Sequence, residues 1–208
     1  GCQEDLVQLL GVGRVTLKQP ARILEHEGLL DVRRGVSGGY YGARPDIGAV
    51  ERAVAIYLRV KQSGFGEALE VAGVLTCEIL RRAALSEDEA GRAKLRALMD
   101  RIAEPRVLTE RPYLEQLERE FTDVVCELAN TPLGELMLRV TMRMFFDAPF
   151  EILPDPFHGV TWQRMRLNEC RAILAHDADF VQILAREFGR ILKTGLEATG
   201  HAGRSPVA

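Results

Sequence analysis

The stretch Leu9–Pro45, LLGVGRVTLKQPARILEHEGLLDVRRGVSGGYYGARP, decides the fold. With the residues just before it, its first half predicts two short helices, Asp5–Leu10 and Arg14–Glu27, joined by a tight Gly-Val-Gly turn. Its second half predicts a hairpin with strands Leu29–Val32 and Tyr40–Ala43, because glycines lie where the intervening turn needs a permissive backbone. We therefore expect a helix-turn-helix followed by a two-stranded wing.

Basic side chains concentrate in this stretch, although the chain as a whole is mildly acidic. The sequence has 27 Lys and Arg against 30 Asp and Glu, a formal net charge of −3, so any contact with a polyanion must be local. The spacing of Leu17, Ala21 and Leu24 predicts that they face inward and leave the basic side of the second helix exposed. No carboxylate occurs from Arg14 to Leu24.

An exposed basic helix suits base edges and phosphates in the major groove, and arginines on a wing suit the backbone or the minor groove. The alternative is an ordinary solvated face, which the turn, the wing glycines and the lack of local acid disfavour. The predicted DNA-binding residues are Arg14, Thr16, Lys18, Gln19 and Arg22 on the helix, and Arg33, Arg34 and Gly38 on the wing.

The composition describes a globular protein of one or two domains. Its 208 residues are 47% hydrophobic and 27% charged, which excludes a disordered chain. There is no apolar run long enough to span a membrane and no signal peptide at the start, so we expect a cytoplasmic protein without membrane contact. The four cysteines include no Cys-x-x-Cys pair, which indicates reduced thiols rather than zinc ligands or disulfides.

Every segment after the hairpin reads as helix. Ser86 with Glu89 three residues later is the signature of a capping box, and the spacing of Leu114, Leu117, Phe121, Val124 and Leu128 is that of a helix packed in a bundle. The segment Ala148–Gly159 carries three prolines and is expected to be a loop. The expected helices are Asp46 to about Lys61, Phe65–Leu85, Ser86 to about Glu104, one from Pro112, Pro132 to about Phe146, Val160–His176 and Asp177–Thr194.

The opening stretch resembles the winged-helix regulators of the GntR type. The family pattern runs approximately V-S-R-x-T-V-R-x-A-L, then L-E-x-E-G-L-V, then R-R-G-x-G-G-G-x-F. Its counterparts here are Val12–Lys18 (VGRVTLK), Leu24–Leu30 (LEHEGLL) and Arg33–Tyr41 (RRGVSGGYY). The resemblance implies a winged helix-turn-helix domain over residues 1–45.

Two features depart from the family pattern. Pro20 stands where the family has a helix former, and an interior proline removes a hydrogen bond and favours a kink that would re-aim Arg22 relative to Arg14. The family also has a further helix ahead of the position of Gly1, so the head is expected to lack its first helix.

The helical part resembles the effector domain of the FadR branch, called FCD, through Cys126–Pro132 (CELANTP) and Ala172–Asp179 (AILAHDAD). We therefore expect a mainly α protein, with an effector-binding and dimerisation bundle of about seven helices over residues 46–197 and a flexible tail over 198–208. Many members of that branch bind a divalent metal through an aspartate and three histidines. Carried over by position, those ligands become Glu118, Thr122, Arg166 (or Cys170 in a shifted alignment) and Phe188, so we expect no metal and no other cofactor.

The same positions suggest how this chain could bind an effector without a metal. One hypothesis is that Arg166 supplies the positive charge directly and pairs with a carboxylate or phosphate of the effector, in a pocket with Glu118, Thr122 and Cys170. The alternative is that Glu118 and Arg166 form an internal ion pair.

The resemblance implies a homodimer that binds a double-stranded, pseudo-palindromic DNA operator, with repression as the commoner mode of the family. Two alternatives remain. One is a small-molecule-binding protein or enzyme whose head is a protein-interaction module, although no nucleophile with its base, no Walker-type loop and no paired carboxylates support an enzyme. The other is a constitutive regulator that has lost effector control.

Overall fold

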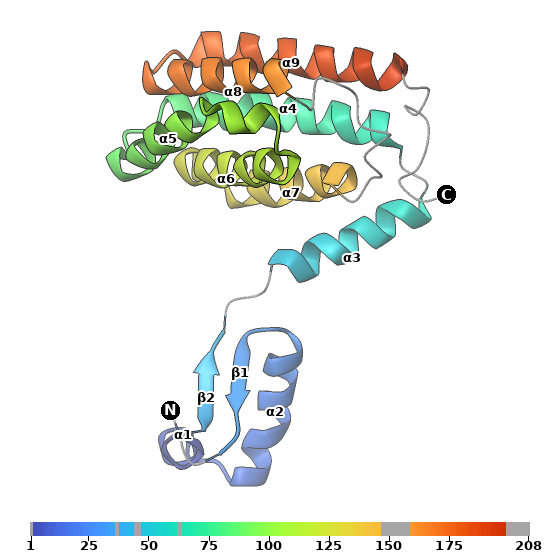
Figure 1. The fold of residues 1–208 in the computed structure, drawn as a ribbon. Helices are drawn as coiled ribbons and strands as arrows, with labels where there is room; N and C mark the ends of the chain where they lie inside the picture. Colours follow the sequence, from blue (N-terminus) through green and yellow to red (C-terminus); the bar gives the residue numbers. More distant parts are fainter. Residues whose placement is uncertain (1, 36–37, 44–46, 62–63, 147–158, 199–208) are drawn as a thin grey trace. The chain divides into compact units, whose positions relative to one another are not determined.

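The structure is a computed structural model that describes residues 2–35, 38–43, 47–61, 64–146 and 159–198. It is mainly α-helical, as predicted, and the described residues contain one antiparallel pair of strands (Figure 1). Contacts between Cα atoms divide the chain into two compact units, Gly1–Arg52 and Ala53–Ala208, which we call the head and the body. This division falls within α3 (Ile47–Val60), whereas the sequence places the boundary after residue 45.

The head is a helix-turn-helix with a two-stranded wing, as predicted. Cys2 caps the first helix, because its thiol accepts from the Asp5 N–H and the Asp5 carboxylate accepts from the Cys2 N–H. Gly11 ends that helix in the left-handed conformation, with φ of 64°. The elements are α1 (Gln3–Leu10), α2 (Arg14–His26), β1 (Leu30–Arg33) and β2 (Gly39–Gly42), and the two strands pair from Leu30↔Gly42 to Arg33↔Gly39.

Helix α2 differs from its prediction in one respect. Leu17 and Ala21 are buried against the rest of the head, but Leu24 is 39% exposed, so the prediction that Leu24 faces inward is wrong. The buried side of α2 is therefore short: it consists of Leu17 and Ala21, one turn apart, and the next turn is exposed to solvent. The helix continues through Pro20 from Arg14 to His26.

The body is an all-helical bundle around α4. This helix packs against α6, α7, α8 and α9, while α5 covers α6 and α8 (Figure 1). Counting α3, the described residues contain seven α-helices from residue 46 onward, the number expected. The body elements are α4 (Phe65–Ala84), α5 (Glu89–Ile102), the 3₁₀ helix η1 (Pro105–Leu108), α6 (Arg111–Ala129), α7 (Pro132–Phe146), α8 (Gly159–Leu174) and α9 (Ala178–Ala198).

One local prediction for the body is wrong, and a second is confirmed with one residue added. The capping box at Ser86 does not form, because α5 begins at Glu89 and its cap is Asp88, whose carboxylate accepts from the Ala90 N–H. Asp88 directly precedes the helix and satisfies one of the N–H groups of its first turn. On α6, Val125 is fully buried while Val124 is only partly buried, so the apolar stripe is one residue broader than predicted.

Two side chains from neighbouring elements cap helix C-termini in the body. Arg92 on α5 is 2% exposed and donates to the Ile173 carbonyl (3.2 Å) and the Leu174 carbonyl (2.6 Å) at the end of α8. His176, with φ of 58° in the turn after α8, places Nδ1 2.9 Å from the Ala84 carbonyl at the end of α4. Both contacts satisfy carbonyls that have no partner within their own helix.

No helix among the described residues is long and apolar enough to cross a membrane. The predicted loop at residues 148–159 lies outside the described residues except for Gly159, which begins α8. The predicted tail at residues 198–208 also lies outside them except for Ala198, the last residue of α9.

Candidate functional site

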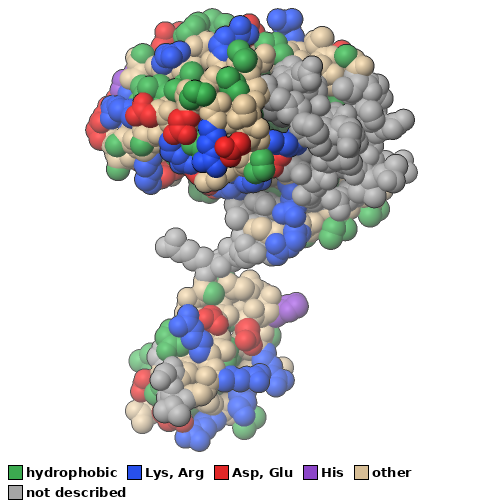
Figure 2. All heavy atoms as spheres, in the orientation of Figure 1, with side chains coloured by type: hydrophobic (Ala, Val, Ile, Leu, Met, Phe, Trp, Pro, Cys, Tyr) green, Lys and Arg blue, Asp and Glu red, His purple; other side chains and the backbone are tan. Residues whose placement is uncertain are grey.

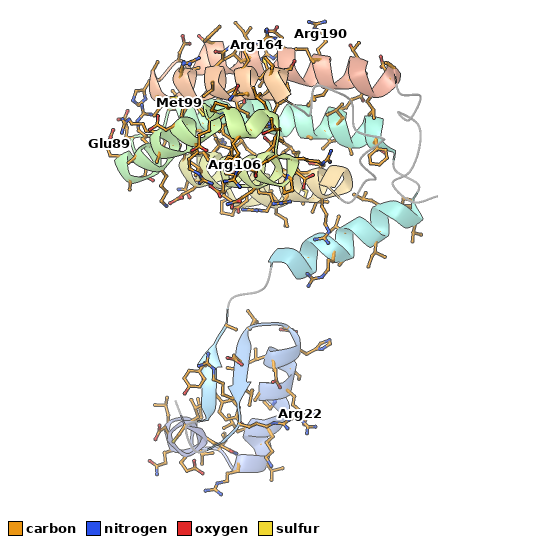
Figure 3. The ribbon with its side chains drawn as sticks, viewed as in Figure 1. Arg22, Glu89, Met99, Arg106, Arg164 and Arg190 are labelled. Carbon is orange, nitrogen blue, oxygen red and sulfur yellow. The ribbon has the colours of Figure 1, made fainter. Side chains whose placement is uncertain are left out.

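Three basic side chains of the head have no carboxylate partner within the part of the chain that the structure describes. Lys18 and Arg22 lie one turn apart on α2, and Arg34 follows β1 on the wing; all three are exposed. They line a single hollow of about 600 Å³ between the two helices and the wing. Figure 2 shows Lys and Arg side chains gathered along α2 on one side of the head, and Figure 3 shows Arg22 projecting from the helix into solvent.

The other two arginines of the predicted set are held by acids within the head. Arg14 Nη2 lies 2.8 Å from Glu4 Oε1, and both side chains are more than half exposed. Arg33 Nε lies 2.8 Å from Asp31 Oδ2 and its guanidinium stacks 4.6 Å from the Tyr41 ring centre. The hydrogen bond to Asp31 raises the pKa of Arg33. A neighbouring carboxylate therefore partly neutralises the positive charge of each of these two arginines.

The uncharged members of the set differ in what they offer. Thr16 and Gln19 are exposed on α2 next to the unpaired cations. Gly38 shapes the wing: its N–H donates to the Gly35 carbonyl (2.9 Å), and a Cβ at position 38 would lie 2.4 Å from the Arg33 carbonyl oxygen. Only glycine fits this turn, so Gly38 acts through the backbone rather than as a contact side chain.

In the body, Arg166 on α8 is the centre of a buried ion cluster. Its Nε and Nη2 donate to the two carboxylate oxygens of Glu118 on α6, at 2.8 and 2.5 Å, and its Nη1 donates to Glu169 at 2.6 Å. Burial opposes the charge on Arg166, but the two carboxylates outweigh it and raise the pKa of the guanidinium. The internal ion pair given above as the alternative is therefore present.

Aromatic side chains enclose this cluster. The rings of Phe121 and Phe188 lie on the Arg166 guanidinium with centroid distances of 4.6 and 4.8 Å, a cation–π contact on a desolvated arginine. The Trp162 indole donates to Glu118 at 2.8 Å. The cluster therefore joins α6, α8 and α9 through one cation.

The sequence reasoning missed Glu169, the second acid of the cluster. It is fully buried; its Oε2 accepts from Arg166, but its Oε1 has no hydrogen-bond partner among the described residues. Burial raises the pKa of Glu169, opposed by the charge of Arg166. Its position three residues after Arg166 on a predicted helix is the signal that could have found it.

The remaining members of the predicted effector pocket take structural positions. The Thr122 hydroxyl donates to the Glu118 carbonyl of its own helix at 3.0 Å. Cys170 is fully buried, and burial raises the pKa of its thiol to about 12. Glu118 and Arg166 line a cavity of about 40 Å³, which has room for one or two water molecules and not for a small organic effector.

The donor set at these positions does not fit a divalent metal. Arg166 places a fixed positive charge at a ligand position, and Phe188 offers a ring that stacks on that charge. Glu118 is the one strong ligand of the set, and both of its oxygens are engaged by Arg166. Among the residues with described side chains, no group of three or more His, Cys, Asp or Glu could hold a metal ion.

The winged helix-turn-helix head and the helical body define the fold of the GntR regulators. The structure named Streptococcus agalactiae GntR is similar over 93% of this chain and 88% of its own length, with a TM-score of 0.67 and 14% sequence identity. At this identity the likeness establishes the fold alone. No protein-family model matches the chain, and a comparison with curated protein sequences finds no match.

Proposed function

We propose that this protein is a cytoplasmic DNA-binding transcriptional regulator that acts as a homodimeric repressor at a pseudo-palindromic operator. The observation that carries the proposal is the set of three exposed cations without carboxylate partners, Lys18, Arg22 and Arg34, on a winged helix-turn-helix head. Cations on a recognition helix and wing neutralise DNA phosphates and orient neighbouring side chains toward base edges. Thr16 and Gln19, which are exposed on the same helix, are the proposed base-contacting neighbours.

A dimer is part of the proposal because one small head offers few contacts. Joining two heads raises their local concentration on DNA and fixes the distance between half-sites. The GntR-like fold supports this arrangement by analogy with the family.

The test is DNA binding by the whole chain to the region upstream of its own gene, with Arg22→Gln as the variant. Arg164→Gln on α8 is the matched control, because Arg164 is also an exposed arginine on a helix (Figure 3). We expect Arg22→Gln to weaken binding about tenfold, in the range of one specific or phosphate contact, and the control to bind as wild type. Equal binding by all three proteins would reject the DNA-binding head.

We also propose that a small effector regulates the protein through the body, with Glu118, Thr122, Arg166 and Cys170 as an inner site that widens beyond its present 40 Å³ when the effector enters. Since Arg166 binds Glu118 with two hydrogen bonds and Glu169 with one, an anionic effector group would displace the carboxylate of Glu169. Because Glu169 lies on α8 with Arg166, the lost contact would leave a buried carboxylate without a hydrogen-bond donor on that helix and would disturb the packing of α8. Arg166→Lys should weaken effector binding, because a single ammonium cannot replace the forked guanidinium.

A further inference from the structure

A groove of about 450 Å³ lies on the surface of the body, where α4 and α9 pack side by side. Its volume lies in the range of small-molecule sites, and its surface is mostly apolar with charges at the edge. The floor consists of Leu69, Gly73, Ala185 and Gly189, and the edge consists of Glu70, Val74, Cys77, Arg186, Arg190 and Lys193.

Two glycines inside helices create this hollow. A Cβ added at Gly73 or at Gly189 would meet no atom within 4 Å, so neither glycine is required for close packing. A glycine inside a helix costs about 1 kcal/mol relative to alanine. Gly91 on α5 is a contrasting case, because its Cβ would lie 2.7 Å from Leu128 Cδ2. Packing within the described body therefore does not explain why positions 73 and 189 are glycines.

The edge of the groove carries excess positive charge. Arg186 and Arg190 lie one turn apart on α9, are exposed, and have no carboxylate partner within the described ranges. Arg186 lines the groove together with Cys77, and Figure 3 shows Arg190 projecting away from the bundle. Lys193 pairs with Glu70 across the groove at 2.6 Å and closes one end of it. An anion in the groove would meet two uncompensated guanidinium groups.

The groove lies directly outside the buried ion cluster. The four floor residues also line the 40 Å³ cavity that Glu118 and Arg166 share. A molecule that occupies the groove would press on the same helix pair, α4 and α9, that encloses Arg166.

We propose that the α4–α9 groove binds a small amphipathic anion, with its apolar body on the floor between Gly73 and Gly189 and its anionic group between Arg186 and Arg190. A second copy of the chain fits less well, because a two-fold contact of α9 against α9 would bring Arg186 and Arg190 of both copies together. This site is distinct from the inner site at Arg166, and it rests on the proposed function only for a consequence on DNA binding. Binding in the groove is measured without DNA, so its failure is distinct from a failure of the head.

The experiment compares two fluorescent molecules with the same aromatic body. 8-Anilinonaphthalene-1-sulfonate carries one sulfonate, and N-phenyl-1-naphthylamine lacks it. We expect the sulfonate to bind the whole chain saturably at one site, and Gly189→Leu to abolish binding of both molecules by filling the open space. The double variant Arg186→Gln/Arg190→Gln should weaken the sulfonate about tenfold and leave the neutral molecule unchanged, as expected for two partly exposed charge contacts.

Controls keep the result interpretable. Arg164→Gln removes an exposed arginine of α8 and should bind both molecules as wild type. Circular dichroism shows whether Gly189→Leu folds. If it does not fold, a second measurement takes its place: the sulfonate should protect Cys77 of the wild-type chain from N-ethylmaleimide, since this half-buried cysteine lines the groove. Sulfonate binding that survives Gly189→Leu, or no protection of Cys77, would overturn the proposal. So would a wild-type dimer that Gly189→Leu converts to monomers in sedimentation, because the groove would then be a subunit contact.

Discussion

Charged side chains in this protein lie either in solvent, as in the head, or in the buried interior of the body. The effect of removing a charge differs between the two. In the head, Arg14 and Glu4 form an exposed pair whose attraction water and salt screen. In the body, Arg166, Glu118 and Glu169 are almost fully buried, so each charge depends on its partners. Residue-scale predictions therefore concern affinity in the head and stability in the body.

Glu4 is expected to weaken DNA binding. It neutralises Arg14 and adds a negative charge close to the proposed phosphate contacts. Glu4→Gln should tighten DNA binding about two- to fivefold at low salt, with the difference shrinking as salt rises. Fluorescence anisotropy on one duplex measures this, with Glu87→Gln on an exposed body turn as the control. Weaker binding by Glu4→Gln would mean that Arg14 needs Glu4 for its orientation.

Glu169 should give stability an unusual dependence on pH. Because burial raises the pKa of this carboxyl, the folded protein binds more protons than the unfolded chain at pH values above 4.5 and below the raised pKa. The free energy of unfolding should therefore fall as pH rises through that window, by up to about 1.4 kcal/mol per pH unit.

Glu169→Gln remains neutral and should lose that slope, which urea unfolding at a series of pH values measures. Glu78→Gln is the control of opposite sign. Hydrogen bonds from Arg81 and Arg82 lower the pKa of Glu78 to about 2, so its contribution is present above pH 4.5 and is lost as pH falls. An unchanged slope in Glu169→Gln would show that Glu169 is ionised in the fold and that Arg166 compensates it fully.

At the scale of elements, the helices of the body are fixed by caps and close crossings more than by their sequence periodicity. Asp88 sets the start of α5, Arg92 closes α8, and His176 contacts the end of α4. Each of these contacts joins an element to a carbonyl or N–H group that its own helix leaves without a partner.

The Arg92 cap should be worth about 2 kcal/mol. Arg92→Met keeps the apolar stem but leaves the carbonyls of Ile173 and Leu174 without their buried donor. Arg96→Met, one turn later on α5, removes an exposed arginine and should cost little. Urea unfolding compares the two variants, and equal stability would contradict a capping role for Arg92.

Replacing glycine by alanine should change the stability of the protein in opposite directions at Gly91 on α5 and Gly73 on α4. Gly91→Ala drives a methyl group into Leu128 and the Asp88 cap, so we expect a loss of about 1–2 kcal/mol after the gain in helix propensity. Gly73→Ala meets open space and should gain about 0.5–1 kcal/mol. Thermal unfolding of the two variants checks both signs. A lower stability of Gly73→Ala would contradict the prediction, because it would mean that α4 and α9 leave no room for a methyl group at position 73.

At the scale of the whole molecule, the sequence predicts the order of the helices and strands well. It predicts the contacts between them poorly. Turn residues, glycines and apolar spacing are local signals in the sequence. They are sufficient to predict the helix-turn-helix, the wing and the seven later helices. Local signals fail where two residues compete for one role, as Asp88 and Ser86 do at the start of α5.

The buried cluster and the groove depend on contacts between helices far apart in sequence. Glu118 and Arg166 were paired through a family resemblance, and Glu169 was missed because its burial follows from the rotation of α8 against its neighbours. The hollow beside Gly73 and Gly189 appears only once α4 and α9 lie together. The exposure of Leu24 likewise reflects how little of the head covers α2.

The central claim is that the head binds DNA through Lys18, Arg22 and Arg34, and the salt dependence of DNA affinity tests it most directly. Each cation that neutralises a phosphate contributes about 0.9 to the slope of log affinity against log salt concentration. We expect steep salt dependence for the wild-type chain, and a slope smaller by about 2.7 per head in Lys18→Gln/Arg22→Gln/Arg34→Gln. A triple variant with the wild-type slope and affinity would contradict the account, because the cations would then lie outside the DNA interface.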